Sequence, residues 1–419
     1  MTFTDDEAAA LTAVDERAVA RELLELLTVP SVTGSAAESE LQHLLAGRLE
    51  RLGLDVDLWS MDLPALRAHP DFPGTEAPRD DAWGLVGTTT GGDGPAVILQ
   101  GHVDVVPPGD RRQWGSDPFA PRVDGDVIHA RGACDMKAGL AANLAALAAI
   151  RAAGIRLPGR VAAHFVVSEE DGGLGAFGTL RRGHTGDACI ITEPTGGTVI
   201  TANGGALTFR IEVPGKATHA STRYSGVSAI DAYLPLHAAL ARLETVRNVG
   251  PDPLMADYPI PYPLAVGIVR AGDWASTVPD LLVAEGRLGV RLGEDPAAAR
   301  AELERCVADA AAADPWLRDH PPTVAWTGGQ FASGRLPAGH PLRDLVSDAH
   351  RDVTGEPGLR ERGAPYGSDL RLYAGAGVPT LQYGPGDVRV AHSPYEKVSV
   401  SETVRVARTL VLAVLRAMS

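Results

Sequence analysis

The architecture of this chain can be worked out from the stretch Leu99-Gln-Gly-His-Val-Asp-Val-Val-Pro107. The apolar run Ala96-Val-Ile-Leu99 leads into it and follows the turn-forming residues 91–95, so a buried strand is predicted here. Because side chains two positions apart in extended backbone point to the same side, His102 and Asp104 are expected to lie together just beyond the strand. This arrangement is typical of a metal ligand and its hydrogen-bonding partner. A His–Asp pair in a loop whose side chains only hydrogen-bond to each other would show the same sequence pattern.

Three further apolar runs, at residues 161–167, 188–191 and 379–383, also end at polar loops. Strands that alternate with helices predict an α/β sheet with much parallel pairing. In such sheets ligands gather at the carboxyl ends of the strands. The side chains that we expect to converge there are His102, Asp135, Glu169, Glu170, Glu193 and His392.

A helix is predicted to begin within Arg131-Gly-Ala-Cys-Asp-Met-Lys-Ala-Gly139 and to run to about residue 153, so Asp135 stands at a loop-to-helix junction. By itself Asp135 could be a simple N-terminal cap, and the adjacent Glu169 and Glu170 could be a solvated charge cluster. Two histidines and three carboxylates without a cysteine, however, favour a catalytic metal site over a structural one. A bridging carboxylate would hold two metal ions about 3.5–4 Å apart, and the glutamate pair could then supply one ligand and one general base.

Other segments predict the surroundings of this site. Residues 13–28 have the spacing of a helix, and so do residues 36–52, for which Ser35 and Glu38 would form a capping box. Residues 63–82 are rich in Pro and Asp and are expected to form an irregular excursion.

Residues 204–318 have a different pattern, in which a strand, a helix, two strands and a helix follow one another, with residues 323–326 as a possible last strand. We therefore expect an α/β catalytic domain with a mixed, largely parallel sheet flanked by helices, formed by residues 1–203 and 319–419. The segment 204–318 would be an inserted α+β domain that serves as a lid or a dimerisation surface.

Composition and net charge argue against several classes of partner and location. The chain has 419 residues and a formal net charge of −15, which argues against nucleic acid as a partner. The acidic N-terminus does not resemble a secretory signal, and no run of about eighteen uncharged apolar residues predicts a membrane span. The three cysteines are widely spaced and form no C-x-x-C pair, so a reduced, cytoplasmic setting is expected.

Six motifs in order make the chain resemble the zinc-dependent amidohydrolase and peptidase family that contains acetylornithine deacetylase, succinyl-diaminopimelate desuccinylase, aminoacylase-1 and glutamate carboxypeptidase. The resemblance covers nearly the full length. The motifs are Gly101-His-Val-Asp-Val-Val-Pro107, Arg131-Gly-Ala-Cys-Asp-Met-Lys137, Ser168-Glu-Glu-Asp171, Glu193-Pro-Thr195, Gly215-Lys-Ala-Thr-His219 and Ala391-His-Ser-Pro394.

The resemblance implies a role for each matched residue. His102 and Glu193 would hold one divalent metal ion, with Asp104 contacting only that histidine and orienting it. Glu170 and His392 would hold a second ion, and Asp135 would bridge the two. Zinc is the first expectation for both ions, and cobalt or manganese fits the same ligands.

The resemblance also implies the groups that act on substrate. Glu169 would be the general base, and His219 would stabilise the tetrahedral oxyanion, reaching the partner subunit's site in dimeric relatives. Arg291 would bind a substrate carboxylate, although it could also be an ordinary surface residue, just as His219 could be an ordinary loop histidine. Ser276 stands where relatives usually carry Asn, which puts contacts near the dimer interface in doubt. Further substrate contacts would come from Ser368, Gly384 and Gly386.

The expected function is hydrolysis of the amide bond of an N-acyl L-amino acid by metal-activated water, as in acetylornithine deacetylase. A dipeptidase or carboxypeptidase is the near alternative, and a homodimer is the expected assembly. A non-catalytic binding protein is disfavoured because every expected ligand and the base are present. A serine hydrolase is disfavoured because the chain has no G-x-S-x-G motif.

Overall fold

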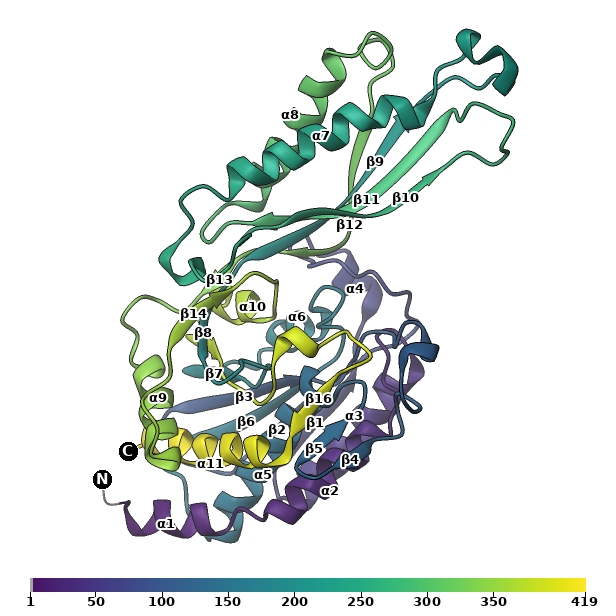
Figure 1. Cartoon of the computed structure of the whole chain (residues 1–419). Coiled ribbons are helices and arrows are strands. Elements are labelled where there is room, and N and C mark those ends of the chain that lie inside the picture. Colours follow the sequence, from purple (N-terminus) through teal and green to yellow (C-terminus); the bar gives the residue numbers. More distant parts are fainter. Residues whose placement is uncertain (1–2) are drawn as a thin grey trace. The chain divides into compact units, whose positions relative to one another are not determined.

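The computed structural model describes residues 3–419, which group into two compact units (Figure 1). Unit 1 runs to Ala202 and continues with Arg335–Arg362 and Asp369–Ser419, whereas unit 2 comprises Asn203–Gly334 and Gly363–Ser368.

Unit 1 is built on a mixed sheet that contains the strand order β1-β2-β6-β3-β7-β15-β8. The central strands β6, β3, β7 and β15 run parallel, whereas β1, β2 and β8 add antiparallel pairings toward the two sides. The predicted fold class, an α/β domain with a largely parallel sheet, is therefore confirmed. The strands are β1 (Asp55–Ser60), β2 (Trp83–Thr88), β3 (Ala96–His102), β6 (Arg160–Val166), β7 (Ala188–Ile191), β8 (Val199–Asn203) and β15 (Thr380–Gln382).

Helices cover both faces of this sheet, and the alternation of side chains along β3 shows why. Val97 and Leu99 pack into the core on one face, while Ile98, between them, packs into the core on the other. His102 is the last residue of the strand, and its side chain is on the same face as that of Ile98. The helices of unit 1 are α1 (Asp5–Thr12), α2 (Glu16–Leu27), α3 (Ala36–Arg51), α4 (Leu63–Arg67), α5 (Ala138–Ala152), α6 (Leu174–Arg181), α9 (Pro341–Thr354), α10 (Leu370–Gly375) and α11 (Val400–Ala417).

Helix α5 is the central helix of the larger core, where it packs against α11 (Figure 1). Together with the turn before it, the helix spans Ala133–Ala152 and is long and apolar enough to cross a membrane by length and composition alone. Because 83% of its apolar window is buried inside the structure, we interpret it as a core helix. A small second sheet combines β4 (Arg122–Asp124), β5 (Val127–His129) and β16 (Lys397–Ser399).

Two details of the first helices differ from expectation. The helix predicted over residues 13–28 begins only at Glu16, because the Asp15 carboxylate caps it by accepting hydrogen bonds from the backbone N–H groups of Arg17 and Ala18. The capping box predicted for α3 is wrong, since Ser35 makes no side-chain cap. Its expected partner Glu38 is buried, and its carboxylate accepts from the backbone N–H of Gly34, one residue before Ser35, and from that of the distant Ser168.

Unit 2 is a four-stranded antiparallel sheet in the order β10-β11-β9-β12, with α7 and α8 packed against its apolar side (Figure 1). The expected insert ended at residue 318, but residues up to Gly334 group with unit 2, because β12 pairs with β9. A register shift between Trp326 and Gln330 interrupts this pairing and obscures the strand in the sequence. The elements are β9 (Gly205–Pro214), α7 (Ala229–Arg247), β10 (Leu264–Ala271), β11 (Leu281–Val290), α8 (Pro296–Ala312) and β12 (Thr323–Phe331).

Candidate metal centre

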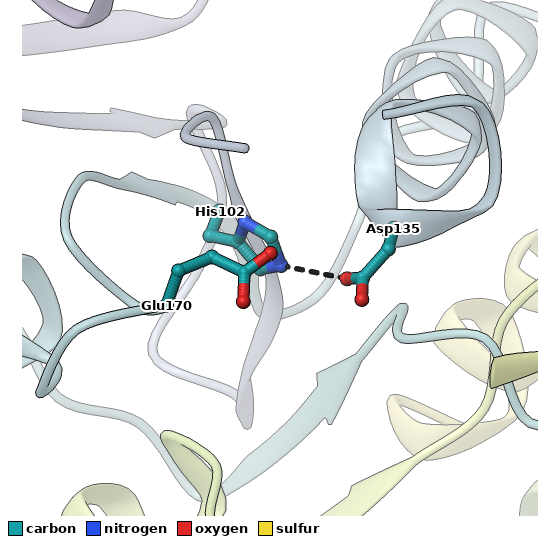
Figure 2. A group of neighbouring side chains, drawn as sticks. All are labelled: His102, Asp135 and Glu170. Atoms are coloured by element: carbon teal, nitrogen blue, oxygen red, sulfur yellow. Dashed lines mark hydrogen bonds and ion pairs between the residues drawn. The ribbon is translucent and has the colours of Figure 1, made fainter. Parts of the chain in front are cut away.

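His102 stands at the carboxyl end of β3 and is almost completely buried. Its Nδ1 lies 2.9 Å from the backbone carbonyl oxygen of Asp104. Because a carbonyl oxygen can only accept a hydrogen bond, Nδ1 carries a proton, and Nε2 is the ring nitrogen that faces the other side chains of the cluster. Nε2 faces two carboxylates, at 3.1 Å from Asp135 Oδ1 and 3.5 Å from Glu193 Oε1. Figure 2 shows this imidazole edge directed at the Asp135 carboxylate.

Asp135 lies between two imidazoles. It is part of the turn Ala133–Lys137 that leads into α5, and its Oδ2 lies 3.4 Å from His392 Nε2 while its Oδ1 faces His102. Burial raises the pKa of Asp135, but the hydrogen bonds with His102 and His392 outweigh burial and hold this pKa below its usual value. A carboxylate with one oxygen on each side can bridge two cations.

Glu170 and His392 complete the second half of the cluster, with Glu170 Oε2 at 3.0 Å from His392 Nε2. Figure 2 shows Glu170 approaching His102 from a different loop than Asp135. The ligand atoms of His102, Asp135 and Glu170 all lie within 4.8 Å of one another, and so do those of His102, Glu169 and Glu193. Two overlapping groups of donors therefore share His102.

The loop that carries the two adjacent glutamates is held by Asp104. Its carboxylate is fully buried and accepts hydrogen bonds from the backbone N–H of Glu169, at 3.1 Å, and of Glu170, at 3.2 Å. It also accepts from the Thr33 hydroxyl at 3.0 Å and lies 3.6 Å from His102 Nδ1. The expectation that Asp104 contacts only His102 is therefore wrong, because its carboxylate holds the glutamate loop and Thr33, whereas the hydrogen bond from the imidazole goes to its backbone carbonyl.

The donor set fits divalent cations. Burial is the main cause that raises the pKa values of Glu169, Glu170 and Glu193, and neighbouring carboxylates raise them further. Within residues 3–419, the ion pairs of Asp135, Glu170 and Glu193 are all with histidines. Glu169 Oε1 is buried without a hydrogen-bond partner among these residues. Imidazole and carboxylate donors with uncompensated negative charge are what zinc, cobalt and manganese bind.

Three of the predicted substrate-contacting residues belong to unit 2, whereas the whole metal cluster belongs to unit 1. His219 is exposed, and its Nδ1 accepts a hydrogen bond from the backbone N–H of Ser221 at 3.1 Å. Arg291 is half-buried, and its Nε donates to the backbone carbonyl of Arg247 at 2.9 Å. Ser368 is buried.

The other two predicted contacts, Gly384 and Gly386, lie in unit 1 and have a packing reason to be glycine. A Cβ on Gly384 would lie 2.2 Å from the backbone oxygen of Thr192, beside Glu193. Gly386 has a left-handed φ of +96°, and a Cβ there would lie 2.6 Å from Cys134 Cβ. Both glycines therefore allow this loop to approach the segments that carry Glu193 and Asp135.

Several buried charged residues around the cluster have no role that the sequence predicts. Arg131 lies within one of the six motifs, Glu396 lies two residues after another, and Glu38 was predicted to form part of a helix cap. The sequence signals a buried charged residue only by placing a charge among apolar or turn-forming neighbours. This signal does not identify the partner of the charge.

Known proteins resemble this chain in sequence and in fold. A profile of peptidase family M20/M25/M40 matches residues 98–416. The chain is 30% identical over 396 residues to N-formyl-4-amino-5-aminomethyl-2-methylpyrimidine deformylase of Bacillus subtilis (strain 168), covering 88% of this chain and 87% of the relative. It is 32% identical over 402 residues to succinyl-diaminopimelate desuccinylase of Methylobacterium sp. (strain 4-46), covering 91% of each chain.

Solved structures share the fold. The dipeptidase Dug1p of Saccharomyces cerevisiae superposes with a TM-score of 0.79 at 14% identity, covering 98% of each chain. A dinuclear metal-binding peptidase of the M20 family from Bacillus subtilis superposes with a TM-score of 0.61 at 16% identity, covering 96% of this chain and 98% of the other.

Proposed function

This chain belongs to peptidase family M20/M25/M40 and is a hydrolase of amide or peptide bonds, and we propose that its substrates are N-acyl amino acids. The observation that carries the proposal is the cluster of the buried His102, the more exposed His392 and three carboxylates beside Glu169, whose Oε1 has no hydrogen-bond partner among residues 3–419. The names of the relatives, a desuccinylase and a deformylase, support removal of an acyl group from nitrogen. A dipeptidase or carboxypeptidase with the same machinery is the second candidate, supported by the fold of the yeast dipeptidase.

Two divalent metal ions are part of the proposal. His102 and Glu193 would hold one ion, Glu170 and His392 the other, and Asp135 would bridge them. When bound, such ions polarise the acyl carbonyl and lower the pKa of water toward about 7. We propose zinc as the native metal, with cobalt and manganese as substitutes that suit the same donors.

Glu169 is the residue that moves the proton. Its carboxylate is buried, its backbone N–H is held by Asp104, and its Oε1 has no competing hydrogen-bond partner among residues 3–419. It therefore can accept a proton from the attacking water and then donate this proton to the leaving amine, as a general base and acid. Asp104 acts on the reaction through Glu169 and His102, as a positioning residue.

His219 is the proposed donor to the oxyanion that forms on the acyl carbonyl. Because its Nδ1 accepts the backbone N–H of Ser221, the neutral ring carries its proton on Nε2, which is then available as a donor. Arg291 would bind the substrate carboxylate with the Nη atoms of its half-buried guanidinium, since its Nε is already engaged. Ser368 and the loop of Gly384 and Gly386 would line the remainder of the substrate site.

We also propose that the chain is a homodimer that works in the cytoplasm. β10 is an edge strand of the sheet of unit 2 and exposes Ile268 and Val269, while α7 exposes Ile230 and Leu234. Exposed apolar edge strands are natural pairing surfaces. Light scattering should give twice the mass of the chain, and Ile268→Lys should give the mass of one chain; a wild-type protein of single-chain mass would contradict the proposal.

A hydrolysis panel tests the activity. Metal-free protein would be incubated with N-acetyl, N-succinyl and N-formyl amino acids and with dipeptides, each with and without added Zn²⁺, Co²⁺ or Mn²⁺. We expect turnover of at least one N-acyl amino acid that depends on metal and is lost in the Glu169→Gln variant. Full activity after chelation would refute the metal-dependent mechanism, and activity on dipeptides alone would favour the second candidate.

A further inference from the structure

The loop that carries Asp135 and the loop that carries His392 are joined by one buried carboxylate. Glu396 is only 1% exposed, although it follows Tyr395, which is 73% exposed. Its Oε1 accepts hydrogen bonds from the backbone N–H of Cys134, at 3.1 Å, and of Asp135, at 3.2 Å. The backbone at Asp135 is thereby tied to a residue four positions after His392.

A buried arginine joins the same two loops a second time. Arg131 is 2% exposed, and its Nη1 donates to Glu396 Oε2 at 2.5 Å. Its guanidinium lies 5.2 Å from the ring centroid of Trp114, and its Nη2 donates to the backbone carbonyl of Pro107 at 3.4 Å. The arginine thus also contacts the segment that continues from the His102 motif.

We propose that Arg131 and Glu396 form a positioning pair, which holds the Asp135 carboxylate and the His392 imidazole at the spacing that the bridged metal pair requires. The inference rests on the proposed function, because Asp135 and His392 are assigned there as ligands. In the contacts that the structure shows, neither side chain of the pair is hydrogen-bonded to the side chain of a proposed metal ligand. Glu396 acts through the backbone N–H groups of the Asp135 loop, and Arg131 acts through Glu396 and the backbone of Pro107.

Energetics favour positioning over a purely stabilising role. A buried ion pair typically contributes little net stability, because the cost of removing both charges from water offsets their attraction. An apolar pair of similar volume could fill the same space, but it could not accept two backbone N–H groups from the turn that contains Asp135. Groups that orient metal ligands typically change metal affinity by about 10–100-fold when they are removed.

The test measures binding of Co²⁺ to metal-free protein by calorimetry and by its visible absorption spectrum. Glu396→Gln keeps the shape of the side chain, but its single oxygen cannot serve Arg131 and the backbone N–H groups together. Arg131→Lys keeps the charge and removes the forked geometry. Arg416→Met is the matched control, because it breaks ion pairs with Glu7 and Asp352 between α11, α1 and α9, away from the ligand loops.

We expect Glu396→Gln to weaken Co²⁺ binding by about 10–100-fold and to change the Co²⁺ spectrum. Arg131→Lys should cause a smaller loss of the same kind, and Arg416→Met should lower the unfolding midpoint while Co²⁺ affinity and spectrum stay as in the wild type. If Glu396→Gln does not fold, the Co²⁺ affinity and spectrum of Arg131→Lys are compared with those of Arg416→Met, and this comparison tests the proposal. Wild-type affinity and spectrum in the folded variants, or an equal loss in the control, would overturn the proposal.

The outcome separates this inference from the proposed function. A wild-type protein that binds two equivalents of Co²⁺ but hydrolyses no member of the substrate panel would refute the function and leave the positioning pair supported if Glu396→Gln binds weakly. An active wild-type enzyme whose Glu396→Gln variant binds Co²⁺ normally would refute the pair alone. A wild-type protein that binds no Co²⁺ would overturn both.

Discussion

Replacing Asp104 with Asn should damage both the stability of unit 1 and its affinity for metal. The Asp104 carboxylate accepts the backbone N–H groups of Glu169 and Glu170 with separate oxygens, at 3.1 and 3.2 Å. In Asp104→Asn one oxygen can still accept, but the side-chain NH₂ group then faces a second N–H donor. The conflict lies in a fully buried position, where water cannot relieve it.

The size of the effect follows from these contacts. A hydrogen bond to a charged acceptor contributes about 1.5–3 kcal/mol, and a buried N–H group left without a partner costs about 1–3 kcal/mol. Because the two contributions overlap, we expect the free energy of unfolding to fall by about 2–4 kcal/mol. Urea denaturation of the metal-free protein, followed by circular dichroism, measures this difference.

A second measurement separates positioning from stability. Because the Asp104 carboxylate fixes the backbone of the loop that carries the proposed ligand Glu170, its loss should also weaken Co²⁺ binding by about 10–100-fold. Asp124→Asn is the control, since Asp124 lies on the exposed strand β4 and should change the free energy of unfolding by less than about 0.5 kcal/mol. If the two variants unfold at the same urea concentration and bind Co²⁺ equally, the role assigned to Asp104 is wrong.

Three further predictions concern other charged groups. Glu169→Gln should lower kcat by about 10²–10⁴-fold and leave Co²⁺ affinity nearly unchanged, whereas Glu170→Gln should weaken Co²⁺ binding, as steady-state kinetics and calorimetry would show. Arg79→Met should lower the free energy of unfolding by about 3–5 kcal/mol in urea, because it leaves two buried carboxylates without their guanidinium. The hydrogen bond from Arg182 is the main cause that lowers the pKa of Asp57, so this pair stabilises the fold above the unfolded-state pKa of about 3.9 and loses its effect as the pH falls through the lower folded-state pKa. The difference in unfolding free energy between wild type and Asp57→Asn, below about 1 kcal/mol at neutral pH, should therefore vanish in acid.

The convergence of the metal cluster could be predicted from sequence because a parallel sheet places consecutive strand ends along one edge. His102 ends β3, Glu169 and Glu170 follow β6, and Glu193 follows β7, so their proximity follows from topology alone. His392 lies further from its strand, β15, which ends at Gln382, but the strand pattern placed it at the same edge of the sheet as the others.

Contacts between loops could not be predicted, because nothing local in the sequence identifies a partner far along the chain. Glu38 shows this clearly. Its spacing from Ser35 is that of a capping box, yet its carboxylate accepts from the backbone N–H of Ser168 and from Arg79, each more than forty positions away. Tertiary contacts of the loop before Glu169 overrode the local rule, which is the general weakness of capping patterns near a functional loop.

The negative charge of the metal cluster explains why its loops need hydrogen bonds from residues far away in the sequence. Four carboxylates, those of Asp135, Glu169, Glu170 and Glu193, lie around two imidazoles, and the burial of Glu169 and Glu193 removes water that would otherwise screen their charge. Repulsion of this kind drives a loop apart unless other contacts fix its backbone. Backbone N–H groups held by Asp104 and Glu396 supply that restraint, and the nearby guanidinium of Arg131 pairs with Glu396 and not with the carboxylates of the cluster. The negative charge is thus kept concentrated for divalent cations, whose binding then stabilises the folded chain by mass action, by about 2.7 kcal/mol at one hundred times the dissociation constant.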